Sequence, residues 1–139
     1  LAGGRGAALN ECTASNVAGG MFVQNSGDVS LEGASFSECT AGEYGGGMLV
    51  ENSGDISLAR SSGDVSLEGA SFSECTAGQS GGGMNVQNSG DVSLEGDSFN
   101  ECTASNVAGG MFVQNSGDVS LEGARFVECT SGSQAALYL

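Results

Sequence analysis

Cysteine is the first residue in this sequence to consider for chemistry, because five cysteines recur at regular intervals. The intervals are 27, 36, 27 and 27 residues, and each cysteine stands in the string E-C-T: Cys12, Cys39, Cys75, Cys102 and Cys129. Stacked in register on parallel strands, they would lie about 4.8 Å apart, close enough for disulfides but rarely with the required dihedral angle. We therefore favour a column of buried free thiols, with at least one disulfide as the alternative. A metal site is a third interpretation, disfavoured because histidine and C-x-x-C pairs are absent.

Carboxylates form two further columns with the same period. They are Asp28, Asp64, Asp91 and Asp118 in one column, and Glu32, Glu68, Glu95 and Glu122 in the other, which Arg5 ends. Stacked like charges repel, and a divalent cation would relieve the repulsion, so these residues are candidate calcium ligands and calcium is the one candidate cofactor. The spacing does not match the G-G-x-G-x-D nonapeptide of calcium-binding β-rolls. We therefore expect a solvated acidic face and commit to no metal or cofactor site.

An internal repeat of about 27 residues generates these columns. The segments 11–37 and 101–127 differ only at Ser35 against Arg125 and at Ser37 against Val127. One interval is longer because the nonapeptides SGDISLARS and SGDVSLEGA stand in tandem, which places a nine-residue insertion within 53–70. We expect the extra copy to loop out around Ile56 to Arg60. The alternative is a fourth side in one coil.

Apolar residues alternate within each copy, which is typical of short strands with one buried face. Met21 and Val23 flank Phe22, and the equivalent position in later copies varies as Leu49, Asn85 and Phe112, which favours an outward site. Inward columns of Met, Val, Leu and Phe recur in every copy. Such strands are too short for independent sheets, but stacked copies can pair with the coils above and below. The sequence therefore predicts an all-β parallel β-helix with three short strands per coil, four to five coils and no substantial helix.

Turn residues separate the strands. An asparagine column is expected to form an amide ladder, and a glycine column beside it is expected to take positive φ values. The asparagines are Asn25, Asn52, Asn88 and Asn115, and the glycines are Gly27, Gly54, Gly63, Gly90 and Gly117. Both columns are interpreted as structural.

The motif F-x-x-C-x-A followed by G-G-M resembles the F-x-x-N and G-G-A-[ILV] repeat of the chlamydial polymorphic outer membrane proteins. The copies that carry the resemblance begin at Phe36, Phe72 and Phe99, and together they cover nearly the whole chain. The resemblance implies a right-handed parallel β-helix of the pectin-lyase-like superfold, secretion, and a role in adhesion or cell-surface structure. Cysteine replaces the asparagine and methionine replaces the small residue of the family motif, so the resemblance bears on the fold rather than on a bacterial origin.

Enzymes of that superfold cleave acidic polysaccharides with carboxylate clusters and basic residues, and this chain has little that fits. The basic residues are Arg5, Arg60 and Arg125, and the acids stand in periodic columns rather than in one irregular cluster. The insertion breaks the period, but its Asp55, Arg60 and Asp64 are too generic to define a catalytic site. Ice binding is a further possibility, because Thr13, Thr40, Thr76, Thr103 and Thr130 form an outward hydroxyl column, but the T-x-T pair is absent.

Composition narrows the range of partners. The formal net charge is −14, which repels nucleic acids and anionic lipids, and no stretch is long and apolar enough for membrane insertion. We expect residues 1–139 to be a single β-helix fragment of a longer solenoid, located outside the cell or on its surface. Expected partners are further coils or other copies of the protein, with glycans or other surface proteins as additional partners. The predicted function is structural or adhesive and non-catalytic, and the alternative is a carbohydrate-binding or carbohydrate-cleaving solenoid.

Overall fold

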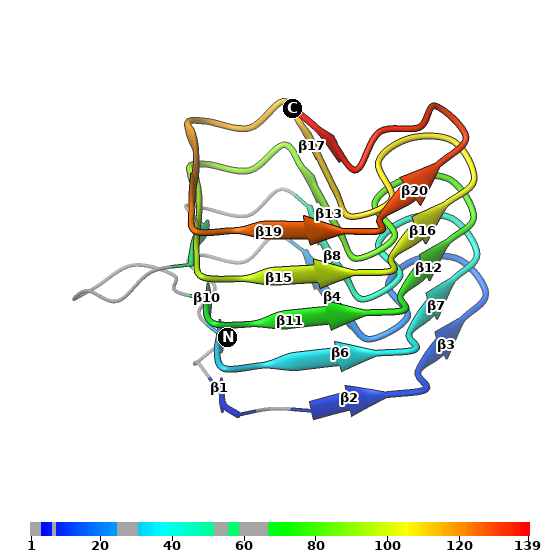
Figure 1. The fold of residues 1–139 in the computed structure, drawn as a ribbon, viewed down its shortest axis with the longest axis horizontal. Coiled ribbons are helices and arrows are strands. Elements are labelled where there is room, and N and C mark those ends of the chain that lie inside the picture. The colour runs from blue at the N-terminus through cyan, green and yellow to red at the C-terminus, as the bar shows by residue number, and fades with distance from the viewer. Residues whose placement is uncertain (1–3, 7, 25–30, 52–55, 59–66) are drawn as a thin grey trace.

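The computed structural model describes residues 4–6, 8–24, 31–51, 56–58 and 67–139. Their strands are all parallel and stack as rungs of a solenoid, with the N-terminal coil at one end and the C-terminal coil at the other (Figure 1). No helix occurs in these ranges, so the predicted all-β parallel solenoid is confirmed. It follows that none of the described segments is a helix with the length and hydrophobicity needed to span a membrane.

Four ladders of parallel strands run along the solenoid. Each is named after a residue that recurs in its strands: leucine, phenylalanine, threonine or methionine. The leucine sheet contains β1 (Gly4–Arg5), β5 (Leu31–Glu32), β9 (Ile56–Leu58), β10 (Leu67–Glu68), β14 (Val92–Glu95) and β18 (Val119–Glu122). The phenylalanine sheet contains β2 (Ala8–Asn10), β6 (Ser35–Ser37), β11 (Ser71–Ser73), β15 (Ser98–Asn100) and β19 (Arg125–Val127).

The other two ladders complete each coil. The threonine sheet contains β3 (Thr13–Ala14), β7 (Thr40–Ala41), β12 (Thr76–Ala77), β16 (Thr103–Ala104) and β20 (Thr130–Ser131). The methionine sheet contains β4 (Met21–Gln24), β8 (Met48–Glu51), β13 (Met84–Gln87), β17 (Met111–Gln114) and β21 (Leu137–Tyr138). The three strands expected per coil are those of the leucine, phenylalanine and methionine sheets, and the two-residue threonine ladder follows a bend at the end of the phenylalanine strand.

Residues in the left-handed region turn the chain at the corners of the coil. In one coil these residues are Gly96, Glu101, Ala108 and Asn115, with φ values between 52° and 71°. The expected positive φ at the glycine column is wrong at Gly90 and Gly117, because Asn88 and Asn115 make that turn instead. Asparagine tolerates the left-handed region better than most residues, and its amide can bond locally. Gly27, Gly54 and Gly63 lie outside the described residues.

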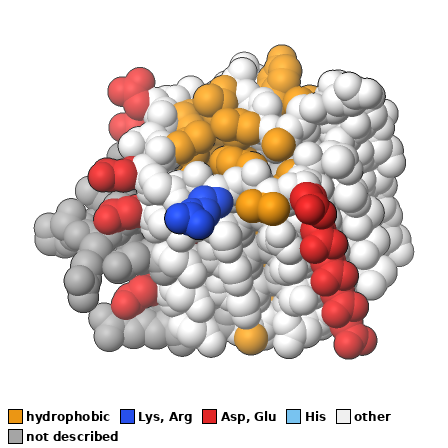
Figure 2. Space-filling model, viewed as in Figure 1, with side chains coloured by type: hydrophobic (Ala, Val, Ile, Leu, Met, Phe, Trp, Pro, Cys, Tyr) orange, Lys and Arg blue, Asp and Glu red, His pale blue; other side chains and the backbone are white. Residues whose placement is uncertain are grey.

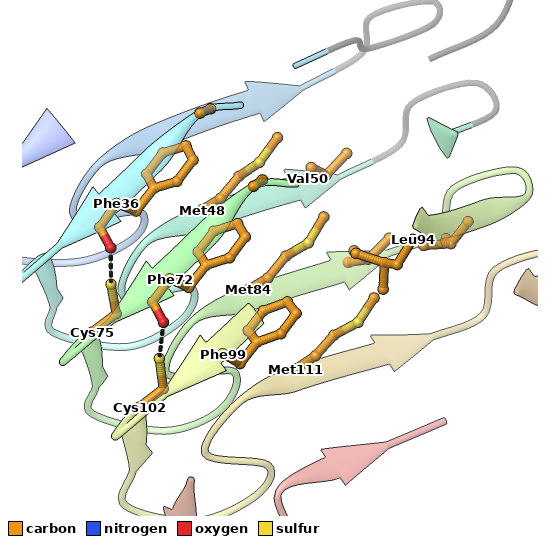
Figure 3. Packing of buried hydrophobic residues seen from close by; sticks show 14 of the residues in the cluster. Phe36, Met48, Val50, Phe72, Cys75, Met84, Leu94, Phe99, Cys102 and Met111 are labelled. Atoms are coloured by element: carbon orange, nitrogen blue, oxygen red, sulfur yellow. Dashed lines mark hydrogen bonds between the residues drawn. The ribbon is translucent and has the colours of Figure 1, made fainter. Parts of the chain in front are cut away.

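The core is built from identical side chains stacked on one another. Phe36, Phe72 and Phe99 stack with ring centroids 4.8 and 4.7 Å apart, which is the spacing of paired strands. Met48, Met84 and Met111 form a second fully buried row beside them (Figure 3). In-register pairing therefore makes the core a set of columns, in which the same residue type recurs from coil to coil.

The variable column between Met and Val lies outside this core cluster, as expected, but most of it is not exposed. Leu49, Asn85 and Phe112 are buried, whereas Phe22 is 45% exposed. The loop between the threonine and methionine sheets folds back over them: the Asn85 amide donates to the Ser80 carbonyl, and a Cβ on Gly81 would lie 2.9 Å from that of Asn85. Alternation gives the direction of a side chain correctly, but it does not reveal what covers that side chain.

The structure describes residues 56–58 and 67–70 of the segment that contains the insertion. Ile56–Leu58 pairs with Val92–Leu94 in the leucine sheet, so the expectation that this part of the segment loops out is wrong. Leu67 and Glu68 rejoin the same sheet between β5 and β14. The first nonapeptide copy therefore contributes a strand, because its Ile-x-Leu alternation is the same as that of a normal coil. Residues 59–66, including Arg60 and Asp64, lie outside the described residues.

The stacked phenylalanines predict that replacing a phenylalanine by alanine destabilises the fold by an amount that depends on its position. Phe72→Ala would remove a fully buried ring that stacks on both sides, and it should lower the free energy of unfolding by about 3–5 kcal/mol. Phe22→Ala is the matched control and should cost about 1 kcal/mol or less, because that ring is partly exposed. Urea unfolding of both variants provides the measurement, and equal losses would contradict a core centred on the phenylalanine column.

Candidate functional site

The cysteine column is internal, and its thiols are free. Cys39, Cys75 and Cys102 are completely buried, whereas Cys12 and Cys129 in the outermost coils are partly exposed. The favoured interpretation, a free-thiol column, is therefore the arrangement that the structure has.

Each of the four later thiols donates a hydrogen bond to the coil before it. The Sγ of Cys75 lies 3.4 Å from the Phe36 carbonyl oxygen, and the Sγ of Cys102 lies 3.3 Å from that of Phe72 (Figure 3). Cys39 and Cys129 repeat the contact with Leu9 and Phe99. A thiol is a weak donor, but here it links successive coils at a position where the sequence predicted only apolar filler.

Burial sets the chemistry of these thiols. It raises the pKa of Cys39 to about 11, so this thiol stays protonated at neutral pH and is a poor nucleophile. Contact with the thiols of Cys129 and Cys75, together with burial, raises the pKa of Cys102. The same contact lowers the pKa of Cys129, which is also partly exposed. Contact with the thiol of Cys102 also lowers the pKa of Cys75, but that thiol is completely buried. Thiol reactivity is therefore expected at the rim of the column, where a thiol is accessible to a reagent.

The aspartate column has a structural role where the structure describes it. A carboxylate oxygen of Asp91 accepts a hydrogen bond of 2.9 Å from the backbone N–H of Asp118 on the next coil. The asparagine column forms one amide contact of the expected kind, in which Asn115 donates to Asn88 at 3.4 Å. Asp28, Asp64, Asn25 and Asn52 lie outside the described residues.

The glutamate column of the leucine sheet is in register. Glu95 pairs with Glu122 and with Glu68, Glu68 pairs with Glu32, and Arg5 pairs with Glu32 at the end of the column, as expected. Glu32 and Glu122 are exposed, and the side chain of Glu68 is not described. Among the described residues, no three cysteine, aspartate or glutamate side chains come together to hold a metal ion. Calcium binding stays a prediction.

A second glutamate column was missed by the sequence analysis, although the E-C-T string contains it. Its members all take φ values near 53° at the bend between the phenylalanine and threonine sheets, and all are exposed: Glu11, Glu38, Glu74, Glu101 and Glu128. A left-handed backbone is costly for glutamate, so each copy accepts strain to turn the corner here. The sequence feature that could have revealed this column is the glutamate that precedes the cysteine in every copy.

The two glutamate columns flank the outer face of the phenylalanine sheet. Figure 2 views this face, with acidic side chains along both of its sides. Between them the strands β6, β11 and β15 present pairs of small polar side chains, such as Ser71 and Ser73, in register from coil to coil. Arg125 and Val127, the two positions at which the near-identical repeats differ, replace the pair in the last strand.

Hydroxyl groups continue around the bend into the threonine sheet. The threonines there are exposed or half-buried, as expected, and the hydroxyls of Thr76 and Thr103 lie 3.1 Å apart. The structure thus places rows of hydroxyl groups beside a row of carboxylates. Such groups can bind cations through the carboxylates and polyols through hydrogen bonds. Asp55, Arg60 and Asp64, the residues considered for catalysis, lie outside the described residues.

Thiol burial predicts a graded labelling pattern. In the native protein iodoacetamide should modify Cys129 first, whereas Cys39, Cys75 and Cys102 should react only after unfolding, because these three thiols are completely buried and out of reach of the reagent. Peptide mass spectrometry before and after denaturation gives the measurement. Equal labelling of all five cysteines in the native state would contradict an internal thiol column.

Comparison with known proteins agrees with this architecture. The profile of the family described as "Right handed beta helix region" matches residues 1–138. Searches of curated proteins and of solved structures gave no match. The profile spans almost the entire sequence, and the stacked parallel ladders are those of such a helix. The chain therefore belongs to the right-handed beta helix family.

Proposed function

We propose that this chain is a non-catalytic structural and adhesive rod that acts outside the cell or on its surface. The observation that carries the proposal is the outer face of the phenylalanine sheet, where small polar side chains stand in register between two glutamate columns. The corner column is exposed throughout, and the column of the leucine sheet is exposed at Glu32 and Glu122. A regular face of this kind repeats one pattern of charge along the rod. It suits contact with an extended or repetitive partner better than recognition of one small molecule.

Electrostatics favour a cationic partner. Neighbouring carboxylates in each column are separated by about 4.8 Å, less than the screening length of about 8 Å at physiological salt. Their potentials therefore add, and a positively charged surface would relieve the repulsion between them. The net charge of −14 extends the same preference to the rest of the chain.

The resemblance to the chlamydial polymorphic outer membrane repeat supports location at a cell surface. The repeated motif beginning at Phe36, Phe72 and Phe99 carries it, and those proteins are exported adhesins. In the present chain the cysteine of the motif lies in the interior and donates to a neighbouring coil, so the substitution preserves the solenoid. The surface around it is consequently free to serve adhesion.

A second candidate function is carbohydrate binding. The specific observation in its favour is the row of serine and threonine hydroxyls beside the corner glutamates, because hydroxyl and carboxylate groups are the partners of sugar hydroxyls. This candidate differs from the first in one measurable respect. Sugar recognition by hydrogen bonds would depend weakly on salt, whereas contact with a cationic surface would depend on it strongly.

A sedimentation assay with three insoluble polysaccharides separates the two candidates. The chain should bind cationic diethylaminoethyl-cellulose and be released by about 0.5 M salt, and it should bind neutral cellulose and anionic carboxymethyl-cellulose weakly. Glu38→Gln, Glu74→Gln and Glu101→Gln together should weaken binding to the cationic cellulose about tenfold. The control triple Glu43→Gln, Glu51→Gln and Asp118→Asn removes the same charge away from that face.

Each outcome of this assay has a distinct meaning. Equal losses in the two triple variants would contradict a role for this face and leave only general charge attraction. Salt-resistant binding to cellulose would support the carbohydrate-binding candidate instead. Release of reducing sugar ends from any of the polymers would contradict the non-catalytic part of the proposal.

Location is tested separately on intact cells that produce the protein. An antibody against the chain should label unpermeabilised cells or the surrounding matrix, because an adhesive rod must be accessible from outside. Permeabilisation should add little signal. Labelling that appears only after permeabilisation would contradict the proposed location, whatever the result of the sedimentation assay.

A further inference from the structure

One carboxylic acid lies inside the solenoid. Asp97 is completely buried, and it occupies a position that other copies fill with alanine: Ala34, Ala70 and Ala124. The position immediately precedes the phenylalanine strand, at the corner with the leucine sheet. Ala34 and Ala70 are also buried, so this column is built for a small apolar side chain.

The two carboxyl oxygens of Asp97 have different surroundings. Oδ1 accepts a hydrogen bond of 2.7 Å from the backbone N–H of Ala70 on the preceding coil. Oδ2 is buried and has no hydrogen-bond partner. An ionised carboxylate in such a place is costly, because water is lost and no counter-charge replaces it. A protonated carboxyl group keeps the bond to Ala70 and avoids the buried charge.

We propose that Asp97 is a proton-operated latch, which holds its coil against the coil of Ala70 when the carboxyl group is protonated and weakens the fold when the proton is lost. The geometry carries the proposal: a fully buried acid, one oxygen bonded across to the neighbouring coil and one oxygen without a partner. Alanine at the equivalent position of the other copies shows that the solenoid does not need an acid there.

The charged groups around Asp97 do not offset its charge. Glu95 ends strand β14, two residues before Asp97, and the pairing places Glu68 and Glu122 in register with Glu95 on the two neighbouring coils. Arg125 donates its backbone N–H to the carbonyl oxygen of Asp97, but its side chain is exposed. The thiols of Cys75 and Cys102 follow the far ends of their phenylalanine strands. Of the described side chains, it is the negative charge of Glu95 that acts on Asp97, and this charge favours the protonated acid.

The pKa of Asp97 is raised from 3.8, its value in an unfolded chain, to about 7, chiefly by burial and to a smaller extent by the charge of Glu95. Hydrogen bonds from the backbone of Ala70 and Glu95 act in the opposite direction and lower the pKa. Below pH 3.8 the group is protonated in both states and adds no pH dependence to the stability. Between 3.8 and about 7 only the folded state keeps the proton, so stability falls as pH rises. A difference of one proton changes the unfolding equilibrium constant about tenfold per pH unit.

The test compares three proteins in urea unfolding from about pH 5 to about pH 8. Relative to Asp97→Ala, the unfolding constant of the wild type should rise about tenfold per pH unit up to about pH 7 and then level off. Asp97→Asn should show the same pH profile as Asp97→Ala, because asparagine keeps the shape and cannot ionise. Both variants should fold, since one restores the residue of the other copies and the other removes the buried charge.

Glu95→Gln controls for the surface charge. It should retain most of the wild-type pH dependence, because the larger cause of the shift is burial of Asp97. The proposal is overturned if Asp97→Asn keeps the wild-type profile, since the dependence would then belong to other groups. It is also overturned if Glu95→Gln abolishes the dependence as fully as Asp97→Asn, which would assign the effect to repulsion along the glutamate column.

Discussion

In-register pairing of parallel strands is the constraint on which the rest of this structure depends. Every backbone group in a ladder bonds to its counterpart one coil away, so equivalent residues of successive copies lie one strand spacing apart. Phenylalanine rings at 4.7–4.8 Å are the visible result. The same constraint brings together side chains that attract one another and side chains that repel one another. It stacks rings and thiols inside and carboxylates outside, and it leaves the chain little freedom to mix them.

The exceptions to like-on-like stacking carry the most information about function. Asp97 places an acid in an alanine column, Arg125 ends a polar row on the phenylalanine sheet, and Asn85 stands in a column of larger apolar residues. Asn85 is satisfied by the loop that covers it, since its amide donates to Ser80 and accepts from Gln87. The carboxyl group of Asp97 is only partly satisfied, because one of its buried oxygens has no hydrogen-bond partner.

The outer surface follows from the same geometry. Bends at glutamates with positive φ turn the chain between the phenylalanine and threonine sheets and also direct a column of carboxylates into solvent. A residue with unfavourable backbone energy is retained in each copy at this corner. The resulting charged edge borders a row of hydroxyls, so the structural and adhesive roles proposed for the chain share one face.

The sequence by itself determined the solenoid, its period of about 27 residues and the inward columns, because a repeat with strict alternation leaves few ways to bury its apolar side chains. It favoured free thiols in the cysteine column over a disulfide but did not decide between them. It did not determine the path of Ile56–Leu58, the burial of Leu49 and Phe112, or the residue that takes the left-handed turn beside Gly117. Only the tertiary structure decided these points. They depend on which loop or coil lies over a given residue, and that contact joins segments whose relative position the local pattern does not contain.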